Sequence, residues 1–230
     1  MQGVNLVLFG MFAKYWESGK VKTRLAATLG ADMARDVYLV FLEHLVQRFS
    51  ASGDRRCLAF SPTERGKEFD QLVGESWDIK PQANGDLGHR MSVFFEEGLA
   101  TAQKVILIGS DTPHLPIEFV DQAVSVLDSN DLVVGPSPDG GYYLIGMSRF
   151  CRSVFDEIAW STPSVLLETK KRIKAASISC GWLPSLRDVD ELDDLEQMLN
   201  RLQASESNSD KVLLRKLRSL GLSLGESEVL

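Results

Sequence analysis

The chain has 230 residues, of which 44% are hydrophobic and 25% charged, a composition ordinary for a soluble globular protein. Its formal net charge of −7, from 25 Lys and Arg against 32 Asp and Glu, disfavours nonspecific binding to nucleic acid or to an anionic membrane. No composition shift divides the chain, so we expect one domain with a sizeable core. Residues 1–9 lack the basic start of a signal peptide and are too few to span a bilayer, so we expect a cytoplasmic protein.

A short apolar run at 4–9 predicts a first buried strand, and we expect a long loop to follow it at 10–24. This loop combines glycine and a hydroxyl with several cations, which suits the binding of phosphates through backbone N–H groups and charge-assisted hydrogen bonds. The glycine spacing matches neither a Walker A loop nor a GxGxxG turn, and a solvated basic loop is the alternative. The candidate phosphate-binding residues are Lys14, Gly19, Lys22, Thr23 and Arg24.

Beyond this loop, apolar runs alternate with helical periodicity. Apolar side chains recur at helical spacing from 31 to 49, which predicts an amphipathic helix that covers a sheet. Strands that alternate with helices imply a mostly parallel central sheet with right-handed crossovers. We expect further strands at 56–60, 77–81, 105–108, 131–135, 142–145 and 177–183, and further helices at 64–72, 87–100, 117–127, from 163 onward, and over 192–202.

The polar segment 82–91 stands before one of these helices and has two interpretations. Asp86 is suited to cap the helix, and Arg90 can be an exposed helix cation. Alternatively, Gln82 and the Gly85 backbone contact a nucleotide while Arg90 contributes to phosphate binding. The local pattern does not decide between these two interpretations.

The stretch GSDTPHLP places Asp111 just after the apolar run 105–108. Open α/β sheets bind their ligands beyond the carboxyl ends of their strands, where Asp111 would lie. One interpretation is a carboxylate that holds Mg²⁺ or Mn²⁺ against a diphosphate, because these cations prefer oxygen ligands. The other is a cap for the turn into the next helix.

Two later turns carry further carboxylates. Asp139 precedes two glycines in GPSPDGGYYLIG, where it either belongs to a hairpin turn or orients and deprotonates an acceptor hydroxyl. Asp188 and Asp190 lie two positions apart in LRDVDELDDL, so on an extended segment both face the same way and can reach one cation. Helix capping is the alternative role for Asp190.

Five motifs follow one another along the chain: FAKYWESGKVKTRL, QANGDLGHRM, GSDTPHLP, GPSPDGGYYLIG and LRDVDELDDL. With them the chain resembles, from Val4 to Leu202, a bacterial family of GT-A-fold, nucleotide-diphospho-sugar transferase-like proteins. Members are often labelled radical-SAM/selenodomain-associated transferases or arsenosugar-type glycosyltransferases. The resemblance implies a single-domain, Rossmann-like GT-A fold with nucleotide over the early loops and a divalent metal at the GSD carboxylate.

The resemblance also implies roles for individual residues. It makes Asp111 the metal ligand and Asp190 the second ligand, and we add Asp188 beside them. It matches Lys14, Lys22 and Arg24 to the phosphate loop of the family. It matches Asp139, Gly140 and Gly141 to a DGG turn in the acceptor half, to which we add Tyr142.

The chain departs from the family at two places. Trp16 and Glu17 stand where the family usually has a Pro-containing turn, and His114 stands where a carboxylate is frequent. We expect His114 on the surface or behind a metal ligand.

We therefore expect a metal-dependent glycosyltransferase that uses a nucleotide-diphospho-sugar donor and a small-molecule acceptor. Asp111 and Asp190 would hold Mg²⁺ or Mn²⁺ on the diphosphate, and Lys14, Lys22 and Arg24 would stabilise developing negative charge. Asp139 would act as general base or acceptor clamp. The closest alternative is a nucleotidyltransferase that moves a nucleoside monophosphate from a triphosphate to a phosphorylated small molecule and releases pyrophosphate. A noncatalytic nucleotide-binding protein ranks third.

The C-terminal part falls outside the resemblance. We expect a transferase domain at 1–202, followed at 203–230 by a polar linker and a short amphipathic helix. This helix, at 212–220, either packs back on the domain or contacts a partner, so a homodimer stays open.

Overall fold

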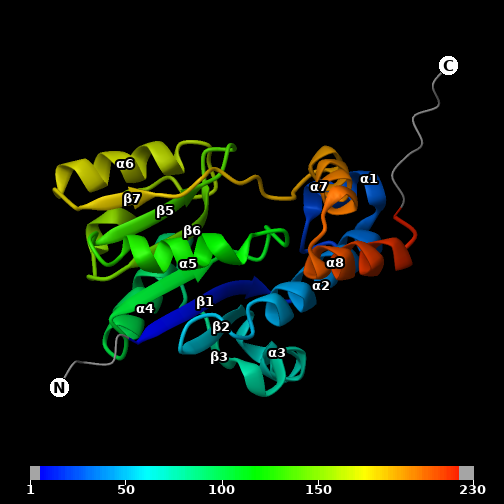
Figure 1. The fold of residues 1–230 in the computed structure, drawn as a ribbon, viewed down its shortest axis with the longest axis horizontal. Helices are drawn as coiled ribbons and strands as arrows, with labels where there is room; N and C mark the ends of the chain where they lie inside the picture. The colour runs from blue at the N-terminus through cyan, green and yellow to red at the C-terminus, as the bar shows by residue number, and fades with distance from the viewer. Residues whose placement is uncertain (1–5, 223–230) are drawn as a thin grey trace.

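The first strand, β1 (Val7–Lys14), lies inside the sheet of the computed structural model, which describes residues 6–222 (Figure 1). It pairs in parallel with β2 (Arg55–Ser61) on one side and with β4 (Lys104–Ile108) on the other. The other strands are β3 (Asp78–Pro81), β5 (Leu132–Pro136), β6 (Tyr142–Met147) and β7 (Cys180–Trp182). The seven strands of this sheet follow the order β3-β2-β1-β4-β6-β5-β7.

Strand β1 extends beyond its predicted end. The prediction of a loop is wrong for residues 10–14, which pair with β2, while Gly10 and Met11 also pair with β4. Glycine suggested a strand end, but here it makes room for a neighbour, since a Cβ on Gly10 would lie 2.3 Å from the Phe94 ring. As a result the strand carries Lys14 to the carboxyl end of the sheet. The start of the predicted strand, at 4–5, lies outside the described residues.

The sheet is mostly parallel, as predicted. Only β6 runs antiparallel, between β4 and β5. Because β1, β4 and β5 run the same way, their carboxyl ends meet at one edge of the sheet, and the turn from β5 into β6 lies there too. Strand β7 is shorter than the predicted 177–183 and pairs in parallel with β5.

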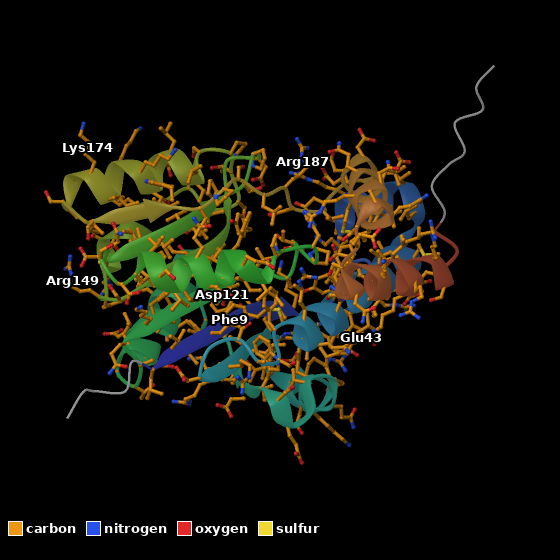
Figure 2. The ribbon with its side chains drawn as sticks, viewed as in Figure 1. Phe9, Glu43, Asp121, Arg149, Lys174 and Arg187 are labelled. Atoms are coloured by element: carbon orange, nitrogen blue, oxygen red, sulfur yellow. The ribbon has the colours of Figure 1, made fainter. Side chains whose placement is uncertain are left out.

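Helices cover both faces of the sheet (Figure 1). Side chains of α2 (Ala31–Arg48), α3 (Gly66–Val73) and α5 (Ile117–Val126) pack on one face around Phe9 (Figure 2). Those of α4 (Leu87–Leu99) and α6 (Val165–Ala175) pack on the other face around Val105. Alternation along each strand sends neighbouring side chains into opposite layers. The helices are α1 (Thr23–Leu29), α2 (Ala31–Arg48), α3 (Gly66–Val73), α4 (Leu87–Leu99), α5 (Ile117–Val126), α6 (Val165–Ala175), α7 (Leu192–Ala204) and α8 (Asn208–Ser219), with short 3₁₀ turns at Thr63–Arg65, Gly74–Ser76 and Arg152–Phe155.

Helix boundaries follow local capping. Asp86 caps α4 as predicted, because its carboxylate accepts a hydrogen bond from the His89 backbone N–H at 2.8 Å. Helix α6 begins at Val165 and not at the predicted Pro163.

In the described range 6–222, no helix has both the length and the apolar character that crossing a bilayer requires.

The predicted C-terminal helix packs back on the domain. Helices α1, α2, α7 and α8 gather at one side of the molecule and share a third apolar cluster, in which Leu213 and Leu217 are fully buried (Figure 1). Arg48 of α2 forms a buried ion pair with Asp210 of α8 at 3.0 Å. The predicted linker is therefore short, since α7 ends at Ala204 and α8 begins at Asn208. Residues 223–230 of the predicted tail lie outside the described residues.

Truncation of Leu213 tests whether α8 is an integral part of the fold. Leu213→Ala removes a fully buried side chain, so we expect a loss of about 2–4 kcal/mol of unfolding free energy in urea titration. The control is Leu167→Ala on α6, where the side chain is 57% exposed and the expected change is within about 0.5 kcal/mol. Equal effects of the two substitutions would contradict the structural role of α8.

Candidate functional site

The candidate site lies at the carboxyl edge of the sheet, where the segment 183–190 crosses it. The backbone N–H groups of Leu183 and Leu186 donate to carbonyls of β5 at 2.9 and 3.1 Å. Further along, the Val189 N–H donates to the carbonyl of Asp111 at 2.9 Å. These bonds bring the acidic segment before α7 against the loop that follows β4.

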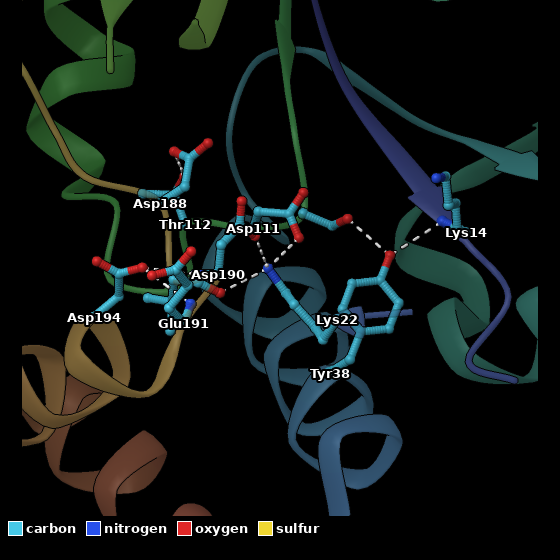
Figure 3. A network of polar contacts seen from close by, with 11 residues as sticks. Lys14, Lys22, Tyr38, Asp111, Thr112, Asp188, Asp190, Glu191 and Asp194 are labelled. Carbon is cyan, nitrogen blue, oxygen red and sulfur yellow. Dashed lines mark hydrogen bonds and ion pairs between the residues drawn. The ribbon is translucent and has the colours of Figure 1, made fainter. Parts of the chain in front are cut away.

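Lys22 joins these two acidic segments (Figure 3). Its ammonium donates to the Val189 carbonyl at 2.8 Å and to Asp190 Oδ1 at 3.1 Å, and it forms an ion pair with Asp111. The Lys22 side chain is 2% exposed, whereas those of Asp111 and Asp190 are 46% and 41% exposed. Burial disfavours the charge, but the two carboxylates outweigh it and hold the pKa of Lys22 above its ordinary value.

The backbone of Lys22 aims this side chain inward. Lys22 stands at the N-cap of α1 with φ 46° and ψ 46°, in the left-handed region that non-glycine residues rarely adopt. Such a conformation costs of order 1–3 kcal/mol, which the contacts of the ammonium help to offset. The sequence pattern gave Lys22 a phosphate-binding role, whereas in this structure its amine contacts carboxylates.

Three oxygens surround the Lys22 ammonium: one from each of Asp111 and Asp190, and the Val189 carbonyl. Hard divalent cations prefer ligands of this kind, and Mg²⁺ often reaches a protein through only one or two carboxylates plus substrate phosphates. Among residues 6–222 no three His, Cys, Asp or Glu side chains gather closely enough to hold a metal by themselves. The donors therefore fit a cation that completes its coordination from a ligand.

Asp188 and Asp190 make different contacts although they were predicted to act together (Figure 3). Asp190 bonds Lys22, whereas Asp188 Oδ1 accepts a hydrogen bond from the Thr112 hydroxyl at 3.1 Å. Burial, followed by the charges of Asp111 and Asp139, raises the pKa of Asp188 to about 7. Asp188 therefore holds its proton more tightly than an exposed aspartate does.

The capping role considered for Asp190 belongs to its neighbour. Glu191 is the N-cap of α7, and its side chain forms a reciprocal capping box with Asp194. The Asp194 carboxylate also accepts from the Asp190 backbone N–H at 3.2 Å. Because Glu191 caps the helix, the Asp190 side chain can contact Lys22.

The other residues of the basic segment lie at the surface. Lys14, Gly19, Thr23 and Arg24 are exposed, and the guanidinium of Arg24 lies 3.7 Å from Glu191. The Arg24 guanidinium thus lies beside the start of α7, whereas Lys14 lies at the end of β1, on the other side of Tyr38 from Asp111 (Figure 3). Arg24 and Lys14 can therefore meet an anionic ligand from solvent.

Tyr38 is a polar residue of the site that the sequence pattern missed. Its hydroxyl lies 2.8 Å from Ser110 Oγ and accepts the backbone N–H of Lys14 at 3.1 Å. Burial and the charge of Asp111 raise the pKa of Tyr38 to about 12. In the sequence, Tyr38 was counted among the apolar positions of a helix, and no local signal distinguishes its hydroxyl from that of a core tyrosine.

Gln82, Gly85 and Arg90 form one hydrogen-bonded group beside the ends of β1 and β2. The Gln82 amide donates to the carbonyls of Ala59 and Ala13 at 2.9 and 3.2 Å. Arg90 donates to the Gly85 carbonyl at 2.9 Å and to Gln82 Oε1 at 3.4 Å. Gln82 and Arg90 also line a cavity of about 270 Å³. The group fixes the loop after β3, and its contact with a nucleotide stays a prediction.

The DGG turn is fixed in place by its glycines. Gly140 has φ 92°, and a Cβ there would lie 2.0 Å from the Pro163 carbonyl oxygen, so the turn packs closely on the segment before α6. Asp139 accepts from the Gly141 N–H at 3.1 Å and stays exposed. The Tyr142 side chain packs in the layer of α4 and α6, where its hydroxyl lies 3.9 Å from the sulfur of Met91 on α4.

Of the residues that mark departures from the family, His114 is buried and Trp16 is partly buried. His114 is 6% exposed, so the expectation of a surface histidine is wrong. Burial, with the nearby charge of Arg201, lowers the pKa of His114 to about 4. Trp16 packs against Tyr15 and Phe69, with ring centroids 4.8 and 5.3 Å apart.

The raised pKa of Asp188 predicts that the unfolding free energy of the protein depends on pH. Its pKa is about 7 in the folded protein against an ordinary 3.8, so ionisation costs folded-state stability progressively as pH rises between these values. Asp188→Asn removes this cost and keeps an oxygen for Thr112. We expect the variant to gain little at about pH 4 and about 1–2 kcal/mol at about pH 8, measured by urea unfolding. Asp121→Asn, at an exposed position of α5 (Figure 2), is the control, and a gain for Asp188→Asn that does not change with pH would refute the assignment.

Comparisons with known structures agree with this architecture. A protein of Desulfovibrio desulfuricans G20, provisionally described as a nucleotide-diphospho-sugar transferase, is 32% identical with a TM-score of 0.85, over 93% of this chain and 96% of its own. A nucleotidyl transferase of Methanothermobacter has 14% identity and a TM-score of 0.61, over 88% and 100% of the two chains. A CMP:2-keto-3-deoxy-manno-octonic acid synthetase complexed with CTP has 15% identity and a TM-score of 0.55, with the same coverage. The chain therefore has the fold of nucleotide-sugar and nucleotidyl transferases, which confirms the predicted fold class.

No curated protein matches the chain. A family model does match, over residues 44–162, and its description is "uncharacterized protein conserved in bacteria (DUF2064)". The match spans half of the chain, and the D. desulfuricans relative is similar along nearly all of it. The chain belongs to the DUF2064 family, within the GT-A-like transferases that its motifs predicted.

Proposed function

We propose that the protein is a metal-dependent transferase that uses a nucleotide-diphospho-sugar as donor and a small molecule as acceptor. The observation that carries the proposal is the convergence of Asp111, Asp190 and the Val189 carbonyl on one cation position at the carboxyl edge. The description of the 32% identical relative supports the same donor class.

Asp111 and Asp190 would hold Mg²⁺ or Mn²⁺ together with the donor diphosphate. When bound, such a cation stabilises the negative charge of a leaving nucleoside diphosphate. Both carboxylates are partly exposed, so a phosphate can approach them from solvent. Asp188, which accepts a hydrogen bond from the Thr112 hydroxyl, would support this loop and could add a further carboxylate to the metal site.

The basic segment would bind the phosphates. Lys14 and Arg24 are exposed and would add positive charge where the leaving group develops negative charge. Gly19 and Thr23 lie on the same exposed segment, where a backbone N–H and a hydroxyl can donate to phosphate oxygens. Gln82, Gly85 and Arg90 would contact the nucleoside from the loop after β3.

The DGG turn would position the acceptor. Asp139 is exposed, and its charge lies close enough to Asp188 to raise the pKa of that carboxyl, so Asp139 would lie near the proposed donor phosphates. A carboxylate there can accept the proton of an acceptor hydroxyl as the hydroxyl attacks the sugar. Gly140 and Gly141 shape the turn, whereas Tyr142 contributes through packing beneath it.

A nucleotidyltransferase is the second candidate. The exposed cations of the basic segment suit a triphosphate as well as a diphosphate, and Lys and Arg would then stabilise the α-phosphate during transfer. In that reaction pyrophosphate would leave. The two candidates differ in the ligand that binds best, which makes ligand binding the deciding measurement.

Thermal unfolding against a panel of nucleotide sugars, nucleoside diphosphates and nucleoside triphosphates, with and without Mn²⁺, tests the proposal. A ligand at 100 times its Kd stabilises the folded state by about 2.7 kcal/mol. For a chain of this size we expect Tm to rise by about 5–10 °C with one nucleotide sugar and Mn²⁺.

Asp111→Asn should abolish the metal-dependent part of this rise, and Asp121→Asn on α5 should retain it. A larger rise with one nucleoside triphosphate would favour nucleotidyl transfer. If no nucleotide raises Tm, both candidate functions are wrong.

A further inference from the structure

The ammonium of Lys22 occupies the position at which the oxygens of the two acidic segments converge (Figure 3). It contacts the carboxylates of Asp111 and Asp190 and the carbonyl of Val189, and its side chain is 2% exposed. A buried ammonium with three oxygen partners uses all three of its donors. Lys22 therefore already occupies the one cation position that these oxygens form.

We propose that Lys22 is an internal competitor of the divalent cation: metal must displace its ammonium from Asp111 and Asp190 before both carboxylates can bind the metal. This inference rests on the metal assignment of the proposed function and adds the role of Lys22. Two cations a few ångströms apart between the same carboxylates repel one another strongly, so simultaneous occupancy is disfavoured.

Contacts that do not involve Lys22 also hold these oxygens together. The backbone hydrogen bond from Val189 to the Asp111 carbonyl, 2.9 Å long, joins the two acidic segments independently of any side chain. The capping box of Glu191 and Asp194 separately fixes the start of α7. Loss of the ammonium should therefore leave a preformed oxygen site.

Displacement has an energetic consequence for the order of binding. In the free protein, metal must overcome the ion pairs of Lys22, so metal alone should bind weakly. A nucleotide brings phosphates that can accept the released ammonium and supply further metal ligands. Metal and nucleotide should then each raise the affinity of the protein for the other, because such coupling is reciprocal.

Lys22→Met tests the competition, because Met is of similar length and uncharged. We expect Lys22→Met to bind Mn²⁺ alone, in isothermal titration without nucleotide, about tenfold or more tightly than the wild type. Lys20→Met is the matched control, since it removes an equal charge two positions away from an exposed side chain paired with Glu17. Lys20→Met should change Mn²⁺ affinity by less than about twofold.

A second measurement uses the wild type and does not depend on the folding of a variant. Lysine labelling by reductive methylation, followed by mass spectrometry, should find Lys22 protected relative to exposed Lys20. Saturating Mn²⁺ should increase Lys22 labelling severalfold while Lys20 labelling stays constant.

The proposal is overturned if folded Lys22→Met binds Mn²⁺ no more tightly than the wild type, or if Mn²⁺ leaves Lys22 labelling unchanged. Both measurements omit nucleotide, so they can fail while the nucleotide panel succeeds. Conversely, failure of that panel would refute the proposed transferase function and leave the competition between Lys22 and Mn²⁺ standing.

Discussion

The crossing of segment 183–190 over the carboxyl edge is the constraint on which the candidate site depends. Buried backbone donors and acceptors must be paired, and this segment pairs first with β5 and then with the Asp111 carbonyl. The path brings residues distant in sequence together, so that Asp190 and Lys22 meet although 168 positions separate them. Side-chain contacts then refine a geometry that the backbone has already fixed.

Charge is concentrated unevenly around this crossing. Four carboxylates, those of Asp111, Asp139, Asp188 and Asp190, gather at one edge of a chain whose net charge is already negative. Their mutual repulsion is relieved in two ways: Lys22 neutralises part of the charge, and the raised pKa of Asp188 favours its uncharged form. A region with this much negative charge attracts cations.

Four helices at one side of the sheet fix the segments that carry the site residues. Helix α1 begins directly after Lys22 and α7 begins shortly after Asp190, and both helices pack in one apolar cluster with α2 and α8. Within it, Leu25 and Leu195 are almost fully buried. Helix α8 closes this cluster through Leu213, so the C-terminal part of the described chain contributes to the placement of the site residues. The division into 1–202 and 203–230 stays a prediction.

The sequence by itself determined the fold class, because alternating apolar runs and helical periodicity follow from which faces of strands and helices must be buried. It also located the acidic and basic segments, since Gly, Pro and Asp after apolar runs mark the ends of strands. It placed the end of β1 too early, because whether a glycine ends a strand depends on its neighbours, here the Phe94 ring against Gly10.

Only the tertiary structure decided which of these polar groups meet. No local pattern reveals that Tyr38 bonds Ser110, or that Asp188 and Asp190 take different partners. The sequence likewise does not show that the Lys22 side chain points into the protein. A lysine ammonium can bind a phosphate or a carboxylate, and the local pattern is the same in both cases. The periodicity that predicts strands and helices depends on residues close together in the sequence. The contacts of Lys22, Tyr38, Asp188 and Asp190 depend instead on where distant segments of the chain cross, which only the tertiary structure determines.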